Sequence, residues 1–338
     1  MENGDGGGRG TGRARAVTLL DVAREAGVAT STVSRALSDP GRVNARTREH
    51  VAAVAQRMGY RPNRLAQALP TGRTGSLAVL VPDITNPHNF GLVRGAEAQA
   101  RAAGSTLLIA DTRESPDLET AHLEGLGSSV DGVVLVSSRL ADADLRRLAE
   151  RIPVVLFNRR VEGLSSVATD SADGSRQIVD HLVSLGHRSI AYLAGPEAAW
   201  SDRQRWTALS SAAEALGASV VRCGPFHPTL DSGAAAAGIG LATGATALVA
   251  FNDLLAIGVL RTLEQRGVEV PGRVSVVGFD DIFGSDFCSP PLTTVAAPVE
   301  EAGRTLVDLL LARREGTTEL TMPTQLRVRA STAAPRIG

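Results

Sequence analysis

Polar and aromatic side chains follow several short apolar runs of this 338-residue chain. Such runs, alternating with amphipathic stretches, predict the strands of parallel βαβ units. Because ligands bind beyond the carboxyl ends of parallel strands, residues at these places are candidates for a binding site. They are Asp83, Asn86 and Phe90 after the run 77–81, Asn158 after 153–157, Asn252 after 247–251, and Asp280 after 274–279.

The sequence lacks the patterns of common catalytic and cofactor chemistry. Its six histidines have no metal-binding spacing, and Cys223 and Cys288 indicate neither a disulfide framework nor a metal site. It contains no nucleophile elbow, phosphate-binding loop or dinucleotide fingerprint. We therefore expect a binding protein rather than an enzyme, without a metal or cofactor.

Charge is unevenly distributed along the chain. Residues 1–75 contain twelve arginines and six acidic residues, whereas residues 76–338 contain twenty-three arginines and thirty acidic residues. We call the basic segment 1–75 the head. Its charge predicts that the head binds a polyanion and that the acidic remainder does not, although a solvated basic tail has the same composition. The chain has neither an eighteen-residue apolar run nor a signal peptide, so we expect a cytoplasmic protein that does not enter a membrane.

The segment 17–59 predicts three short helices. Apolar residues recur on one helical face from Leu19 to Ala26, Thr18 stands at the N-cap position, and Gly27 ends the helix. A second helix turns its polar residues outward, and a third begins after an Asn44 cap. This pattern is typical of a helix-turn-helix unit, whose second helix enters the major groove of DNA, although a plain helical hairpin has the same spacing.

The motif VTLLDVAREAGVATSTVSRAL (17–37), followed by GYRPNRLAQAL (59–69), closely resembles the DNA-binding domain and hinge of the LacI/GalR family of bacterial repressors. The resemblance extends from residue 17 to about residue 330. It implies a helix-turn-helix domain followed by a two-lobed, periplasmic-binding-protein-like sensor of doubly wound parallel sheets. It also implies a homodimer that binds a double-stranded, pseudo-palindromic DNA operator.

The resemblance implies roles for residues of the second helix. Thr30, Ser31 and Arg35 would read base edges, and an arginine there can pair bidentately with guanine. The residues implied to contact phosphates are Thr18, Thr32 and Ser34. Ala29 stands where the family usually has serine, which removes a helix cap unless Thr30 takes that role instead of reading a base.

A hinge follows the three predicted helices. Asn63 to Leu69, between Pro62 and Pro70, forms at most about two helical turns, which are unstable alone. The resemblance implies that this helix forms in the minor groove at the operator centre. Leu69 would be an apolar wedge between base steps, and Asn63 and Arg64 would contact DNA beside it.

The resemblance also implies roles in the sensor. Arg205, Asn252 and Asp280 match a polar triad that grips the ligand, Asn158 matches a first-lobe contact, and Phe226 matches an aromatic that stacks on a sugar face.

Alternatives remain open for these sensor residues. Asn252 or Asp280 could only cap a helix, Phe226 could belong to the core, and Arg203 could replace Arg205 as the contact. His88 and Asn89 stand where relatives often have two aromatics, so the ligand need not be a sugar. The lone His187 matches a structural histidine at a strand start.

We thus predict a ligand-responsive transcriptional regulator, most simply a repressor of carbohydrate genes that binds a sugar or sugar derivative. A nucleoside, purine or other metabolite is the alternative effector, and a solute-binding protein or an enzyme is the remaining alternative. The predicted parts are a disordered leader (1–16), the DNA-binding domain (17–62), the hinge and linker (63–75), a first lobe (76–165 and 293–322) and a second lobe (166–292 and 323–338).

Overall fold

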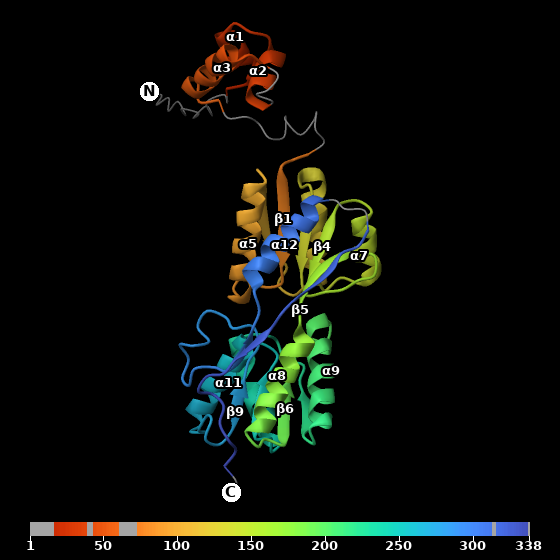
Figure 1. Cartoon of the computed structure of the whole chain (residues 1–338), viewed down its shortest axis with the longest axis vertical. Helices are drawn as coiled ribbons and strands as arrows, with labels where there is room; N and C mark the ends of the chain where they lie inside the picture. The colour runs from red at the N-terminus through yellow and green to blue at the C-terminus, as the bar shows by residue number, and fades with distance from the viewer. Residues whose placement is uncertain (1–16, 39–42, 61–72, 313–315, 337–338) are drawn as a thin grey trace, which may run out of the picture. The chain divides into compact units, whose positions relative to one another are not determined.

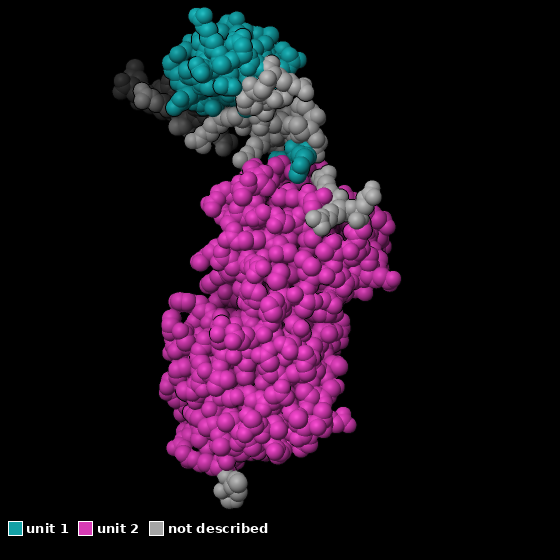
Figure 2. Space-filling view, in the orientation of Figure 1, with its two compact units in different colours: residues 1–74 teal, residues 75–338 magenta. Residues whose placement is uncertain are grey.

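The computed structural model describes residues 17–38, 43–60, 73–312 and 316–336. The predicted leader lies outside the described residues, as do Asn63, Arg64 and Leu69 of the predicted hinge. The chain divides into two compact units, residues 1–74 and residues 75–338 (Figure 2). Each unit is described by itself below.

The first unit contains three helices, α1 (Leu19–Ala26), α2 (Thr30–Ser38) and α3 (Ala45–Arg57). The Thr18 hydroxyl accepts a hydrogen bond from the backbone N–H of Asp21, whose carboxylate accepts one from the N–H of Thr18, which makes a capping box. The Asn44 side chain caps α3 through the N–H of Thr47. A small apolar core joins the three helices, and the predicted helix-turn-helix unit is confirmed.

Ala29 occupies the N-cap position of α2, since its carbonyl oxygen accepts hydrogen bonds from the N–H groups of Thr32 and Val33. Its methyl group cannot accept a further bond. We expect Ala29→Ser to stabilise the head by about 1 kcal/mol, because a serine hydroxyl at this position can accept from an N–H of the first turn. Hydrogen exchange of the α2 amides measures this, with the exposed Ala53→Ser as the control.

The first lobe of the second unit is a six-stranded parallel sheet with the order β11-β5-β4-β3-β1-β2 (Figure 1). Its strands are β1 (Ser76–Val81), β2 (Thr106–Asp111), β3 (Val133–Val136), β4 (Val154–Phe157), β5 (Ser165–Thr169) and β11 (Glu319–Met322). Its helices are α5 (His88–Ala102), α6 (Pro116–Leu126), α7 (Asp142–Ala149) and α12 (Val299–Ala312), with a 3-10 turn at Gly127–Ser129.

Alternate side chains of β1 point to opposite faces of the sheet and pack in two different hydrophobic cores. Leu77 and Val79 pack with residues of α5 and α12, whereas Leu80 packs with residues of α7, so helices cover both faces of the sheet. The α5 and α12 backbones approach closely at two glycines. A Cβ atom on Gly95 would lie 1.9 Å from the Glu300 carbonyl oxygen, so larger residues do not fit there.

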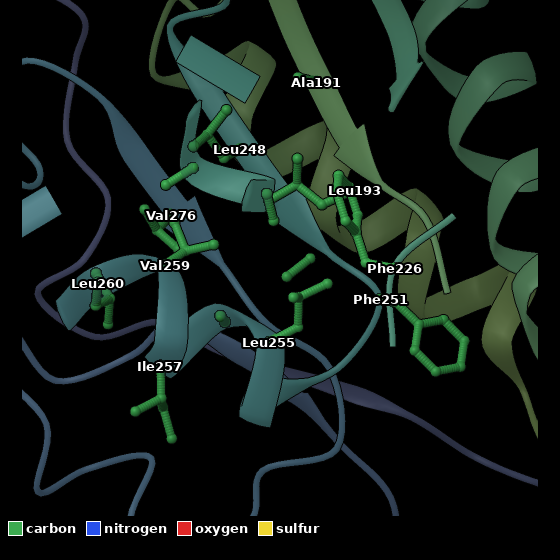
Figure 3. Packing of buried hydrophobic residues seen from close by; sticks show 14 of the residues in the cluster. Ala191, Leu193, Phe226, Leu248, Phe251, Leu255, Ile257, Val259, Leu260 and Val276 are labelled. Atoms are coloured by element: carbon green, nitrogen blue, oxygen red, sulfur yellow. The ribbon is translucent and has the colours of Figure 1, made fainter. Parts of the chain in front are cut away.

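The second lobe is a four-stranded parallel sheet with the order β7-β6-β8-β9. Its strands are β6 (Ser189–Leu193), β7 (Ser219–Cys223), β8 (Ala247–Ala250) and β9 (Ser275–Val277). Its helices are α8 (Ser171–Ser184), α9 (Trp200–Ala215), α10 (Gly233–Ala242) and α11 (Asp253–Gln265), with a 3-10 turn at Leu230–Ser232. Leucine, valine and alanine side chains of β6, β8 and α11 fill one side of this sheet (Figure 3). The predicted two-lobed, doubly wound fold is confirmed.

The lobe boundaries differ from the predicted ones by a few residues. β5 pairs with β4, so the first lobe continues to Thr169 rather than ending at 165. A short strand, β10 (Thr294–Ala296), pairs antiparallel with β12 (Gln325–Arg327), and its Val295 packs in a second-lobe core. The chain therefore returns to the first lobe between β10 and α12, not at 293, because β10 buries its apolar side chain in the second lobe.

His187 is a structural residue of the second lobe, as its position indicated. It is 1% exposed, and its ring nitrogens lie 2.8 Å from the Thr246 hydroxyl, 3.1 Å from the Ser275 hydroxyl and 2.9 Å from the Ala333 carbonyl oxygen. Burial lowers the pKa of His187 below its ordinary value of 6.5.

Because the folded pKa is the lower one, the unfolded chain binds more protons below pH 6.5. We therefore expect the free energy of unfolding to fall as the pH drops through this value. His187→Gln should make that loss smaller, and the exposed His227→Gln should leave it unchanged. Urea unfolding between pH 5 and pH 8 measures the difference, and equal pH profiles for His187→Gln and the parent chain would contradict the assignment.

Candidate functional site

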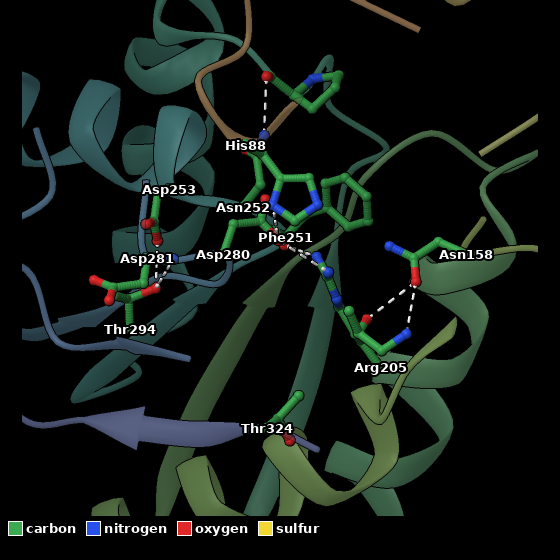
Figure 4. A network of polar contacts seen from close by, with 12 residues as sticks. His88, Asn158, Arg205, Phe251, Asn252, Asp253, Asp280, Asp281, Thr294 and Thr324 are labelled. Atoms are coloured by element: carbon green, nitrogen blue, oxygen red, sulfur yellow. Dashed lines mark hydrogen bonds and ion pairs between the residues drawn. The ribbon is translucent and has the colours of Figure 1, made fainter. Parts of the chain in front are cut away.

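Arg205, on α9, stands at the centre of a polar network in the second lobe (Figure 4). Its side chain is 4% exposed, donates to the Phe251 carbonyl oxygen and donates to Asp280 Oδ1 at 3.3 Å. The guanidinium carbon lies 3.7 Å from the ring centre of Phe279 and 4.8 Å from that of Phe251. Stacking between two rings fixes the guanidinium plane and offsets part of the cost of burying its charge.

Asn252 and Asp280 follow neighbouring strands of this sheet, as predicted. Asn252 caps α11 by accepting from the N–H of Leu255 at 3.0 Å, and its amide donates to the Pro228 carbonyl oxygen at 3.2 Å. Asp280 has a φ of 117°, a region that non-glycine residues rarely adopt. Such strain is typical of functional positions that the surrounding structure holds in place.

A buried carboxyl group, Asp253, holds the loop that carries Asp280. Asp253 is 0% exposed, accepts from the Ile282 N–H at 2.9 Å and accepts from the Thr294 hydroxyl at 2.5 Å. Burial, and then the nearby charge of Asp280, raise the pKa of Asp253 well above its ordinary value. Asp253 thus ties together the start of α11, the loop after β9 and strand β10.

The first lobe contributes His88 to the same network. The His88 ring stacks on Phe157 with ring centres 6.4 Å apart, and its Nδ1 atom lies 3.7 Å from Asp280 Oδ1. This nitrogen is buried and makes no hydrogen bond within the described residues. His88 was singled out in the sequence only as a departure from two aromatics, and its contact with Asp280 had no signal in the sequence. We call Arg205, Asn252, Asp280 and His88 the Arg205 cluster.

At the ends of first-lobe strands, three predicted site residues accept hydrogen bonds from backbone N–H groups. They are Asn158, Asp83 and Asn86. Asn158 accepts from the Thr169 N–H at 2.9 Å. The Asp83 carboxylate accepts from the Thr85 N–H at 2.8 Å, and Asn86 accepts from the His88 N–H at 3.0 Å. Asn86 therefore positions the residue that reaches Asp280.

Three further predicted site residues are not members of the Arg205 cluster. Phe90 is 52% exposed and lines a groove with Ile84 and Ile109. Phe226 is buried in the second-lobe core beside Phe251 (Figure 3). The remaining residue is Arg203, which is exposed on α9, two positions before Arg205 and therefore on another side of the helix.

The first unit presents a polar face on α2. Val33 and Ala36 are buried, whereas the predicted base-reading residues Thr30, Ser31 and Arg35 are exposed. The Arg35 side chain makes neither an ion pair nor a hydrogen bond with any described residue. The other predicted contacts are Ser34, which is exposed, Thr32, which is half-buried, and Thr18, whose hydroxyl also donates to the Asp21 carboxylate at 2.6 Å.

Comparisons with known proteins match both units of the chain. The family of "Bacterial regulatory proteins, lacI family" matches residues 18–63, and the "Periplasmic binding protein-like domain" matches residues 179–332. The HTH-type transcriptional regulator DegA of Bacillus subtilis is 33% identical over 330 residues, which cover 94% of this chain and 98% of DegA. The chain belongs to the lacI family of bacterial regulatory proteins.

Other members support the same assignment over the whole length. The regulator CelR of Thermobifida fusca is 35% identical over 339 residues, covering 94% of this chain and 99% of CelR. The crystal structure of the Lac repressor dimer bound to operator and the anti-inducer ONPF matches with a TM-score of 0.85 and 29% identity, covering 95% of this chain and 100% of that chain. This lacI-family protein is therefore a ligand-responsive transcriptional regulator with a DNA-binding head and a sensor. In its described part, we find no helix that is long and apolar enough to span a membrane.

Proposed function

We propose that this lacI-family regulator is a repressor that binds a pseudo-palindromic operator as a homodimer and responds to a sugar or sugar derivative. The observation that carries the proposal is the Arg205 cluster, in which side chains from α9, α11, the loop after β9 and the first lobe meet. The cluster combines hydrogen-bonding groups with aromatic rings, a combination that suits a ring with polar edges and apolar faces. Thr30, Ser31 and Arg35 are the proposed base contacts.

The charges of the cluster favour a neutral ligand. The guanidinium of Arg205 is already paired with the Asp280 carboxylate, so it offers no uncompensated charge to a phosphate or carboxylate. A solved relative, described as the "transcriptional regulator CelR-cellobiose complex", holds a neutral sugar and is 32% identical to this chain. A nucleoside is the second candidate, because the stacked His88 and Phe157 rings can also contact a planar base.

An exposed apolar surface of the first lobe supports the homodimer. Ile84, Phe90, Leu108 and Ile109 are between 40% and 52% exposed, and β2 is the edge strand of the sheet. Exposed apolar patches of this kind mark protein–protein interfaces. We propose that α5 and β2 form the first-lobe half of the dimer contact, and that this DNA-binding dimer acts in the cytoplasm and has no enzymatic activity.

Capture of genomic fragments on the purified full-length protein, at a stated salt concentration, tests the proposal. We expect enrichment of a palindromic site beside transport or catabolic genes. Neutral sugars, their phosphate esters and nucleosides are then titrated against the protein–operator complex. A response to neutral sugars supports the proposal, whereas a response to nucleosides alone would replace the sugar with the second candidate. No enriched site in the absence or presence of these compounds would contradict the repressor assignment.

A further inference from the structure

A buried carboxylate lies near the start of α9, about one helical turn before Arg205. Asp202 is the third residue of this helix and is 0% exposed. Its Oδ1 atom accepts from the backbone N–H of Gly195 at 2.7 Å and from the Tyr192 hydroxyl at 2.8 Å. Its Oδ2 atom accepts from the Arg222 guanidinium at 2.5 Å. Three donors, one of them charged, offset the cost of burying this carboxylate.

The three donors belong to two neighbouring strands of the second-lobe sheet. Tyr192 lies in β6, which Gly195 follows, and Arg222 lies in β7, the edge strand. Tyr192 and Arg222 are partners in the parallel register of these strands, so both reach Asp202 from the same level of the sheet. The Arg222 side chain is 36% exposed, so this ion pair extends from the surface to the interior of the lobe. Asp202 therefore joins the first turn of α9 to β6 and β7.

Arg205 reaches its acceptors from the next turn of α9. Asp202 and Arg205 are three residues apart, so their side chains leave the helix on the same, buried face. The terminal nitrogens of Arg205 donate to the Phe251 carbonyl oxygen and to Asp280. Its Nε atom is buried and makes no hydrogen bond within the described residues. The position of the Arg205 backbone on α9 therefore decides whether the terminal nitrogens reach their acceptors.

A ring contact adds to the connection between α9 and β6. Trp206 follows Arg205 on α9 and stacks on Tyr192, with ring centres 6.2 Å apart and 19° between the ring planes. Tyr192 is 0% exposed and also donates its hydroxyl hydrogen to Asp202. It thus contacts α9 at residue 202 and again at residue 206, on both sides of Arg205.

We propose that Asp202 and Arg222 are positioning residues of the effector site, because together they set where α9 places the Arg205 guanidinium. This inference rests on the proposed function, and it adds to the effector site a pair of residues outside the Arg205 cluster. Strand β7, which carries Arg222, lies at the opposite edge of the sheet from β9, which precedes Asp280. The affinity for the effector thus depends on a surface arginine that does not touch the effector.

A double-mutant cycle in urea tests the positioning without any effector. Asp202→Asn keeps the size of the side chain and an oxygen that accepts from the Gly195 N–H, but it removes the charge opposite Arg222. If Asp202 positions Arg205, this variant has already weakened the contacts of Arg205. Adding Arg205→Met should then lower the unfolding midpoint by at most about half as much as it does in the parent chain. Additive changes in the midpoint would overturn the proposal.

A substitution of Arg222 tests the same role from the surface, and it also serves if Asp202→Asn does not fold. We expect Arg222→Met to raise the Kd of the full-length protein for a responding neutral sugar, with cellobiose as the first probe, by about tenfold. The affinity of the sugar-free protein for the operator should stay within about twofold. Arg222→Lys should recover much of the sugar affinity, since it restores a cation beside Asp202. The matched control is Arg188→Met, which changes an exposed arginine that donates to the Val183 carbonyl oxygen.

The possible outcomes separate this inference from the proposed function. If the parent chain binds no neutral sugar, the proposed sugar effector fails, and the double-mutant cycle still decides whether Asp202 positions Arg205. If Arg222→Met binds the sugar as tightly as the parent chain or as Arg188→Met, the positioning role fails and the sugar effector stands. Equal losses of sugar and operator binding in Arg222→Met would show a general loss of structure and would also overturn the proposal.

Discussion

Arg205→Met is expected to lower the free energy of unfolding by about 3–5 kcal/mol, because it leaves the Asp280 carboxylate buried without its partner. The Asp280 side chain is 8% exposed, so water compensates little of that charge. Adding Asp280→Asn should recover part of the loss, since the double variant buries no unpaired charge. Both variants should lose the response to the effector, because each removes a proposed contact.

A double-mutant cycle in urea measures this coupling. Arg203→Met is the control, since Arg203 lies on the same helix and is exposed. If Arg205→Met and the double variant are equally unstable, pairing with Asp280 is not what Arg205 contributes. A normal effector response in folded Arg205→Met would remove Arg205 from the effector site.

Arg35→Ala should weaken binding to the captured operator by roughly 10- to 100-fold, which corresponds to about 1–3 kcal/mol for one bidentate base contact. Binding to unrelated DNA should fall much less, because a base contact contributes specificity rather than general affinity. Discrimination at one base pair of each half-site should relax at the same time.

Arg57→Ala is the matched control for Arg35→Ala. Arg57 belongs to α3 of the same unit and pairs with Glu25 at 3.1 Å in an exposed ion pair, so its loss removes the same charge without a predicted base contact. Equal losses for the two variants on operator and unrelated DNA would show that Arg35 acts only through its charge.

The sequence contained enough information to predict most elements and two of the caps. Apolar runs give β1, β3, β4 and β8 because both faces of these strands are covered, and Thr18 and Asn44 cap their helices as their positions indicated. The lobe boundaries were harder to predict from the sequence. β5 and β10 are short strands, and each pairs with a strand that is distant in the chain, β11 and β12 respectively, so only the folded sheets decide to which lobe each belongs.

The candidate site was partly predictable. Asn252 and Asp280 follow the neighbouring strands β8 and β9, and Arg205 reaches Asp280 from within α9. The sequence could not decide the roles of Phe226, which is buried, and Phe90, which is exposed, since a core aromatic, a surface aromatic and a ligand-stacking aromatic look alike in a sequence. Asp253 and His88 acquire their importance from contacts across the fold, which local patterns do not contain.

The connections around Asp280 differ in strength on its two sides. Toward α11 and β10, the Asp280 loop is held through Asp253 by hydrogen bonds of 2.5 and 2.9 Å, and β10 leads directly into α12 of the first lobe. Toward His88, the Asp280 carboxylate makes a longer approach, 3.7 Å from Oδ1 to His88 Nδ1. A ligand bound between His88 and Asp280 would therefore separate this contact between the lobes, while the hydrogen bonds of Asp253 would keep the Asp280 loop in place within the second lobe.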